Sequence, residues 1–155
     1  MSFRITGLEP APFARYFAMS DQQLAAHGAV RRTVDHNPGF PCRVSLEDGA
    51  VGEEVVLLPY EHHAVDSPYR GAGPIYVRRA ATRAFDGIDR VPPVVARRLV
   101  SVRAYDAAAM MVGADVCHGS ELPALVERFF ADPATAYLHV HNAKPGCFSC
   151  RVERA

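Results

Sequence analysis

The C-terminal part of the sequence contains residues 137–152, YLHVHNAKPGCFSCRV, in which two alternating runs flank a turn. Residues 137–141 and 148–152 place an apolar side chain at every second position, the pattern of a strand with one buried face. Residues 142–146 contain Asn, Pro and Gly, which favour a turn. This stretch therefore predicts a β-hairpin.

The same reasoning predicts further strands upstream of this hairpin. Residues 100–105 alternate between apolar and polar positions, and residues 109–116 are their expected partner. Residues 42–46 also alternate, so we expect them to form a half-buried strand in an antiparallel hairpin with residues 54–60. Shorter strands are expected over residues 3–8, 29–35 and 75–78.

Helical patterns are fewer and mostly short. The longest covers residues 120–131, where Ser120 is the expected N-cap and Asp132-Pro133 ends the helix. Short helices are expected over residues 10–19, 21–27 and 93–98. Ser20 and Gln23 have the spacing of a capping box at the start of the second of these.

Strands outnumber helices, and the helices do not separate every pair of strands. This order argues against a doubly wound parallel sheet. A length of 155 residues fits one core. We therefore predict a single α+β domain over residues 1–155 with a largely antiparallel sheet, a few short helices and one longer helix. A strand-rich, barrel-like arrangement with helices covering its ends is the alternative.

Composition limits the partners and the compartment. Seventeen basic and seventeen acidic residues give a net charge of zero, which argues against nucleic acids and anionic membranes as partners. Neither a long apolar span nor a secretory signal is evident, so we expect a cytoplasmic protein whose four cysteines are reduced.

Several unusual phrases together resemble a known protein family. They are Pro38–Leu46 (PGFPCRVSL), Tyr60–His62 (YEH), Ser67–Arg70 (SPYR), Arg103–Asp106 (RAYD) and Leu138–Lys144 (LHVHNAK). The sequence resembles the bacterial domain of unknown function family 1203 over nearly its whole length. This resemblance implies a single-domain bacterial protein, but it implies no activity, cofactor or catalytic residue.

His139 and His141 are the candidate catalytic residues. Residues i and i+2 of a strand point to the same side, so the two imidazoles are expected to stand next to each other. Histidine titrates near neutral pH and suits proton transfer. Metal binding with His62 or His63 as a third ligand, and a purely structural role, are the alternatives. The sequence assigns no metal ligand set and no cofactor.

Arginines on polar strand faces are the candidate binding residues for an anion. Arg43 and Arg103 are expected on the polar sides of two strands, and Arg70 lies in a long loop over residues 61–74 that could cover a ligand. The full set of predicted substrate-binding residues is Arg43, Tyr60, His62, Tyr69, Arg70, Arg103 and Asn142. The alternative is that each arginine pairs with a nearby acid, of which the candidates are Glu47, Asp48, Glu61 and Asp106.

The cysteines carry a weaker signal. Cys147 and Cys150 are three residues apart, but in a strand this spacing points the two thiols to opposite sides, which disfavours a redox or zinc motif. Cys42 is expected to be a small buried apolar residue, with a role as nucleophile as the alternative.

Three functions remain open from the sequence. The first is an enzyme that acts on a small polar or anionic molecule, with histidines for proton transfer and arginines for charge. The second is a non-catalytic sensor that uses the same pocket. The third is an interaction module, including a homo-oligomer. Phosphate-binding loops, dinucleotide-binding motifs, nucleophile elbows and zinc-protease motifs are absent from the sequence.

Overall fold

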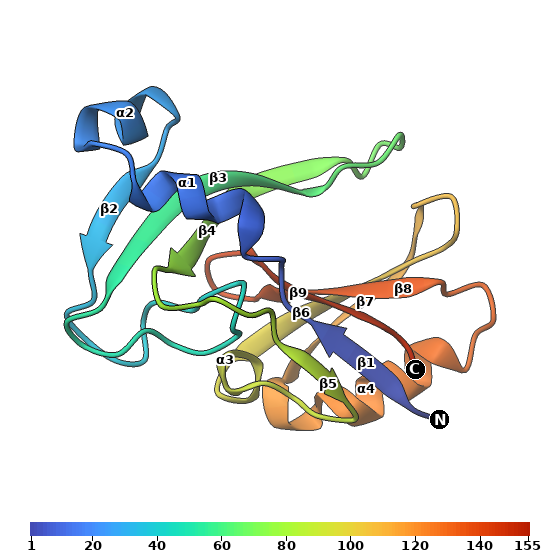
Figure 1. Cartoon of the computed structure of the whole chain (residues 1–155). Coiled ribbons are helices and arrows are strands. Elements are labelled where there is room, and N and C mark those ends of the chain that lie inside the picture. The colour runs from blue at the N-terminus through green and yellow to red at the C-terminus, as the bar shows by residue number, and fades with distance from the viewer.

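The computed structural model describes all 155 residues and contains nine strands in two sheets (Figure 1). The larger sheet has the order β5-β1-β9-β8-β6-β7, and the smaller has the order β2-β3-β4. All strand pairs in both sheets are antiparallel. The α+β class with mainly antiparallel sheets is therefore confirmed.

The larger sheet is built around the predicted C-terminal hairpin. Its strands are β1 (Phe3–Thr6), β5 (Asp86–Ile88), β6 (Leu99–Tyr105), β7 (Met111–His118), β8 (Tyr137–Asn142) and β9 (Phe148–Arg154). Strand β8 pairs with both β9 and β6, and β6 pairs with β7. Both hairpins expected in this half of the sequence are present.

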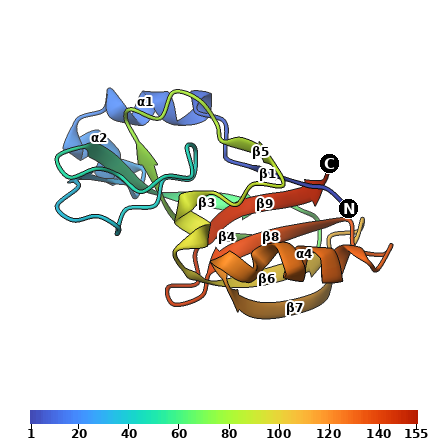
Figure 2. The same ribbon diagram turned by 90° about the horizontal axis from the view of Figure 1, so that it is seen from below.

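Helix α4 (Leu122–Phe130) covers one face of the larger sheet (Figure 2). Its buried residues pack with Val102 of β6 and with Leu138 and Val140 of β8 in the main apolar core. Side chains alternate along β8, so the residues that directly follow Leu138 and Val140 point to the opposite face of the sheet, away from α4. This second face carries His139 and His141.

The smaller sheet contains β2 (Val30–Thr33), β3 (Glu54–His63) and β4 (Gly71–Arg78). The N-terminal helices η1 (Ala11–Phe13), α1 (Ala14–Phe17) and α2 (Asp21–Ala26) lie against it (Figure 1). Phe13 and Leu24 from these helices pack with Val56, Leu58 and Ile75 in a second core. The β3–β4 hairpin extends over the larger sheet, which brings the ends of the two sheets together.

The remaining helices are short. Helix α3 (Pro93–Ala96) precedes β6, and the 3-10 turn η2 (Gly119–Glu121) precedes α4. The predicted capping box of α2 is confirmed, since Gln23 N–H donates to Ser20 Oγ at 3.2 Å and Ser20 N–H donates to Gln23 Oε1 at 2.8 Å. Ser120 is not the N-cap of α4, because η2 occupies that position. None of the helices has the length and apolar composition needed to span a lipid bilayer.

The predicted strand over residues 42–46 is wrong. This segment is a tight turn closed by Leu46 N–H, which donates to the carbonyl of Cys42 at 3.0 Å. It lies between the sheets, where Arg43 N–H donates to Tyr76 O of β4 and the carbonyl of Arg43 accepts from Leu8 N–H. Cys42, Arg43 and Leu46 are all buried, so the alternation of residue types does not reflect a polar face. Residues 54–60 pair with β2 and β4 instead.

The long loop predicted over residues 61–74 is also wrong. Strand β3 continues to His63 and β4 begins at Gly71, so the connection covers only residues 64–70. Glycine and proline near Pro74 resemble a turn in the sequence, but β4 is an edge strand, where proline is tolerated. A consequence is that His62 and His63 belong to a strand.

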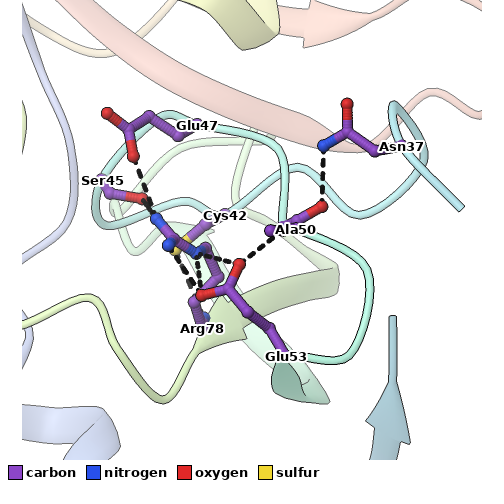
Figure 3. A network of polar contacts seen from close by, with 8 residues as sticks. Asn37, Cys42, Ser45, Glu47, Ala50, Glu53 and Arg78 are labelled. Carbon is purple, nitrogen blue, oxygen red and sulfur yellow. Dashed lines mark hydrogen bonds and ion pairs between the residues drawn. The ribbon is translucent and has the colours of Figure 1, made fainter. Parts of the chain in front are cut away.

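A polar network around Arg78 holds the irregular segment over residues 34–53 against β4 (Figure 3). The Arg78 guanidinium donates to Glu53 Oε1 at 2.7 Å, to Glu47 Oε2 at 3.0 Å and to Ser45 Oγ at 3.1 Å. Its backbone N–H donates to Cys42 Sγ at 3.3 Å. One side chain therefore fixes several points of the segment that carries Arg43.

Candidate functional site: a histidine cluster beside a basic pocket

Four histidines from two strands meet between the sheets, and we call His62, His63, His139 and His141 the histidine cluster. His139 and His141 do stand next to each other on β8, with ring centroids 6.3 Å apart. The β3 histidines approach from the smaller sheet, since His62 lies 5.1 Å from His141 and His63 lies 4.8 Å from His139. The cluster thus depends on the extension of β3 beyond Tyr60.

Aromatic rings and hydrogen bonds enclose the cluster. The ring of Phe148 stacks on His62 at 5.2 Å, and Tyr105 lies 4.4 Å from His63. His63 Nδ1–H donates to Tyr69 O at 2.8 Å, and the Tyr137 hydroxyl donates to His63 Nε2 at 2.7 Å. The tautomer of His63 is therefore fixed on both sides.

Two buried imidazole nitrogens in the cluster lack a partner. His141 Nδ1–H donates to the carbonyl of Gly146 at 2.9 Å, which leaves Nε2 as a buried acceptor with no donor. The Nδ1 atom of His139 is also buried and unpartnered. Neither Glu61 nor Asp106, the acids considered as partners for a histidine, accepts a hydrogen bond from the cluster, since Glu61 binds Arg70 and Asp106 binds backbone amides.

Burial keeps His139 and His141 neutral at neutral pH. His139 and His141 are only 2% and 1% exposed. Burial, with the positive charges of neighbouring groups, lowers the pKa of His139 to about 2, and burial lowers that of His141 to about 4. The pKa of His62 is lowered for the same main reason. The predicted pair is thus a set of neutral imidazoles at neutral pH.

No group of three His, Cys, Asp or Glu side chains is arranged to hold a metal ion. The alternative in which His62 or His63 completes a metal site with the β8 pair therefore has no support from the geometry. What the cluster offers chemically is two neutral nitrogen atoms in a largely aromatic setting.

A basic pocket of about 660 Å³ lies next to the cluster, between β4, the end of α3 and the β8–β9 turn. This volume is in the range of small-molecule sites. Its lining contains four basic residues and no acidic one. The lining residues are Gly39, Pro41, Arg43, Leu57, Pro74, Tyr76, Arg97, Arg98, Leu99, His118, Asn142, Lys144, Pro145 and Cys147.

Arg43 is the buried charge of this pocket, with an exposure of 2%. Its Nε–H donates to the carbonyl of Phe148 at 2.7 Å, Nη1 donates to the carbonyl of Pro41, and Nη2 donates to Cys147 Sγ at 3.0 Å. None of these partners is a carboxylate. Burial lowers the pKa of Arg43, because removing the charged guanidinium from water is energetically unfavourable.

Arg97 and Arg98 carry the outer positive charge of the pocket and share one acid. Arg98 donates to both carboxylate oxygens of Asp48, at 2.6 and 3.1 Å, and Arg97 lies 3.7 Å from the same carboxylate. Asp48 is almost fully buried behind them. The pocket therefore keeps a positive excess, to which the exposed Lys144 adds.

Asn142 closes the pocket beside Cys147 and is 4% exposed. Its Nδ2–H donates weakly to Cys147 Sγ at 3.4 Å, while its Oδ1 atom is buried and has no partner. The pocket thus presents several donors, and one buried acceptor in its wall has no partner.

The predicted substrate-binding residues fall into three places. Arg43 and Asn142 line the basic pocket, whereas His62 lies in the histidine cluster with the predicted catalytic pair. Arg103 stands opposite His139 in the β6–β8 register, so it faces the cluster. The residues expected to form one site therefore lie in two neighbouring places.

The side chains of three predicted residues lie outside both sites. Tyr60 packs on Phe13, with ring centroids 5.7 Å apart. Arg70 is exposed and forms an ion pair with Glu61, as the alternative expectation held. Tyr69 contributes its backbone carbonyl to the cluster rather than its ring.

Sequence reasoning missed most of the pocket's charge. Arg97, Arg98, His118 and Lys144 were not predicted site residues. The only available signal was local, because the adjacent arginines end the short helix after Pro92-Pro93 and the one lysine lies in the β8–β9 turn.

Comparison with known proteins assigns the chain to a family without assigning a function. No curated protein and no solved structure is significantly similar to the chain. One family model matches residues 39–154, a region that contains the whole basic pocket and the whole histidine cluster. Because this match covers most of the chain, the protein belongs to the family described as Protein of unknown function (DUF1203).

Proposed function

We propose that the protein binds a small anionic molecule in the basic pocket. The observation that carries this proposal is Arg43, a buried guanidinium with no carboxylate partner at the bottom of a pocket lined by three further basic residues. A buried charge is costly unless an opposite charge compensates for it. A carboxylate or phosphate in the pocket would provide this compensation through charge-assisted hydrogen bonds.

The pocket supports binding more directly than turnover. His139 and His141 are absent from its lining, and their low pKa values leave little imidazolium to act as a general acid at neutral pH. A sensor or carrier of an anionic metabolite is thus the role that we favour over an enzyme with these histidines as catalysts.

A thermal-melt screen of the full chain tests the proposal. The panel contains inorganic phosphate, citrate, sugar phosphates and nucleotides, with neutral sugars and polyamines as controls. A ligand at about 100 times its Kd adds about 2.7 kcal/mol of stability, which raises the melting temperature of a domain of this size by several degrees. We expect at least one anion, and no polyamine, to produce such a shift.

Two exposed pocket residues and one distant arginine make matched variants. R97Q and K144Q each remove one charge from the pocket, and we expect each to weaken anion binding by about tenfold. R32Q removes one exposed charge from β2, outside the pocket, and should leave binding unchanged. The proposal fails if no anion binds, or if R32Q weakens binding as much as the pocket variants do.

Self-association is a second candidate, supported by strand β7. This strand is an edge of the larger sheet and exposes Val112 and Val116. An edge strand with exposed apolar residues can pair with another copy. Light scattering should then show a dimer that V116K converts to a monomer, and a monomeric wild-type chain at high concentration would exclude this assembly.

A further inference from the structure

The basic pocket contains one cysteine whose setting differs from those of the other three. Cys147 is half-buried and lines the pocket, whereas Cys42 and Cys150 are fully buried in the cores. Cys117 lies on the edge strand β7, where it packs against the main core and does not line the pocket. Only Cys147 combines access to the pocket with direct contact to a cation.

Two donors point at the sulfur of Cys147. Arg43 Nη2 lies 3.0 Å from Sγ and Asn142 Nδ2 lies 3.4 Å from it. Hydrogen-bond donors and a nearby guanidinium stabilise negative charge on sulfur, and the thiolate is the nucleophilic form of cysteine. This sulfur is also the only ionisable group that the side chain of Arg43 contacts.

The unpaired acceptor beside Cys147 indicates which polar groups a ligand would carry. Asn142 Oδ1 is buried, unpartnered and part of a side chain that lines the pocket. A buried acceptor is normally paired, and a molecule that reaches this wall of the pocket with a donor such as an amide N–H would supply the missing partner. The surrounding arginines and Lys144 favour carboxylates on the same molecule.

We propose that Cys147 is a nucleophile that forms a mixed disulfide with small acidic, amide-containing disulfides. The thiolate attacks one sulfur of the disulfide RS–SR, a Cys147–SR bond forms, the RS–SR bond breaks, and RS⁻ leaves and takes a proton from water. The disulfide is the oxidant, so no other co-reactant is needed. This inference rests on the proposed anion binding and adds the substrate class and the reacting atom.

A series of disulfides that differ in charge tests the inference. The full-length chain is incubated with glutathione disulfide (anionic), 2-hydroxyethyl disulfide (neutral) or cystamine (cationic), and intact mass with peptide mapping gives the rate at each cysteine. We expect glutathione disulfide to modify Cys147 about tenfold faster than cystamine does, because the positive pocket concentrates anions. C147S should lose this adduct.

Cys117 is an internal control in the same experiment. Burial, together with the nearby acids Glu121 and Asp115, raises the pKa of the Cys117 thiol. Any reaction at Cys117 should therefore be slow and should not favour the anionic disulfide. K144Q should slow modification of Cys147 by glutathione disulfide several-fold more than it slows modification by the neutral disulfide.

The outcomes separate this inference from the proposed function. An unmodified Cys147, or equal rates with anionic and cationic disulfides at Cys147, overturns the inference. If phosphate or citrate still raises the melting temperature of the wild-type chain in that case, the anion pocket stands without a nucleophile. If neither occurs, both proposals fail.

Discussion

Replacing His139 with glutamine tests whether the histidine cluster makes the fold sensitive to acid. The folded protein holds the pKa of His139 at about 2, whereas the unfolded chain has the ordinary value of 6.5. Below pH 6.5, His139 is protonated in the unfolded state but stays neutral in the folded state. The free energy of unfolding is therefore highest above pH 6.5 and falls as the pH decreases toward the folded-state pKa.

The magnitude follows from the linkage relation. One pH unit in this window corresponds to about 1.4 kcal/mol for each such group. From pH 6.5 to 5.0, His139 removes about 1.6 kcal/mol of stability, and His141, with a pKa of about 4, removes about the same. The two histidines together account for a loss of about 3 kcal/mol in the wild-type chain.

Urea unfolding followed by circular dichroism measures this loss, since the chain contains no tryptophan. H139Q removes one titrating group, so the contribution of the cluster between pH 6.5 and 5.0 should fall by about half. H139Q also loses ring contacts with Tyr105 and Phe148, which lowers stability at every pH, so the comparison uses the dependence on pH rather than the absolute value. H27Q, at the exposed histidine that ends helix α2, controls for the loss of an imidazole. Equal pH dependence in H139Q and wild type would refute the reasoning.

Three further substitutions and one matched control test the packing of the fold. R78Q should lower the free energy of unfolding by about 3 kcal/mol in a urea titration, because it breaks a mostly buried ion pair and leaves its carboxylate partner uncompensated. G119A should cost at least about 2 kcal/mol by the same assay, since its Cβ would lie 1.8 Å from a carbonyl oxygen of α3, whereas G73A meets no atom within 4 Å and should cost less than about 1 kcal/mol. Y137F removes the hydroxyl that donates to His63 Nε2 and should lower the melting temperature, with a cost of about 1 to 3 kcal/mol for the unpaired buried acceptor. Equal melting curves for Y137F and wild type would contradict that role.

The larger sheet was predictable because its strands carry their own local signals. The alternation of residues 137–141 and 148–152 identified the central hairpin, and the same pattern over residues 100–105 identified its neighbour. Alternation also placed His139 and His141 on one face, which the β8 register confirms. These features depend on the alternation of side chains between the two faces of a strand. This period of two residues can be read directly from the sequence.

The segment over residues 42–46 shows why other parts were not predictable. Its alternation was the same as that of a strand, but its backbone hydrogen bonds go to β4 and to residues near β1, so long-range contacts override the local pattern. The same limit applies to the basic pocket. Arg43, Arg98 and Lys144 come from three distant parts of the chain, and only the arrangement of the two sheets brings them together.

Arg43 gives a physical reason to expect that a ligand in the pocket stabilises the whole fold. Its backbone N–H donates to the carbonyl of Tyr76 in the smaller sheet. Its side-chain Nε–H donates to the carbonyl of Phe148, the first residue of β9 in the larger sheet. The ring of Phe148 in turn stacks on His62 of β3. An anion that compensates the Arg43 charge therefore acts on the residue that joins the two sheets. Binding should raise the single melting transition of the chain rather than order one loop, because the same side chain supports the pocket, the junction and one wall of the histidine cluster.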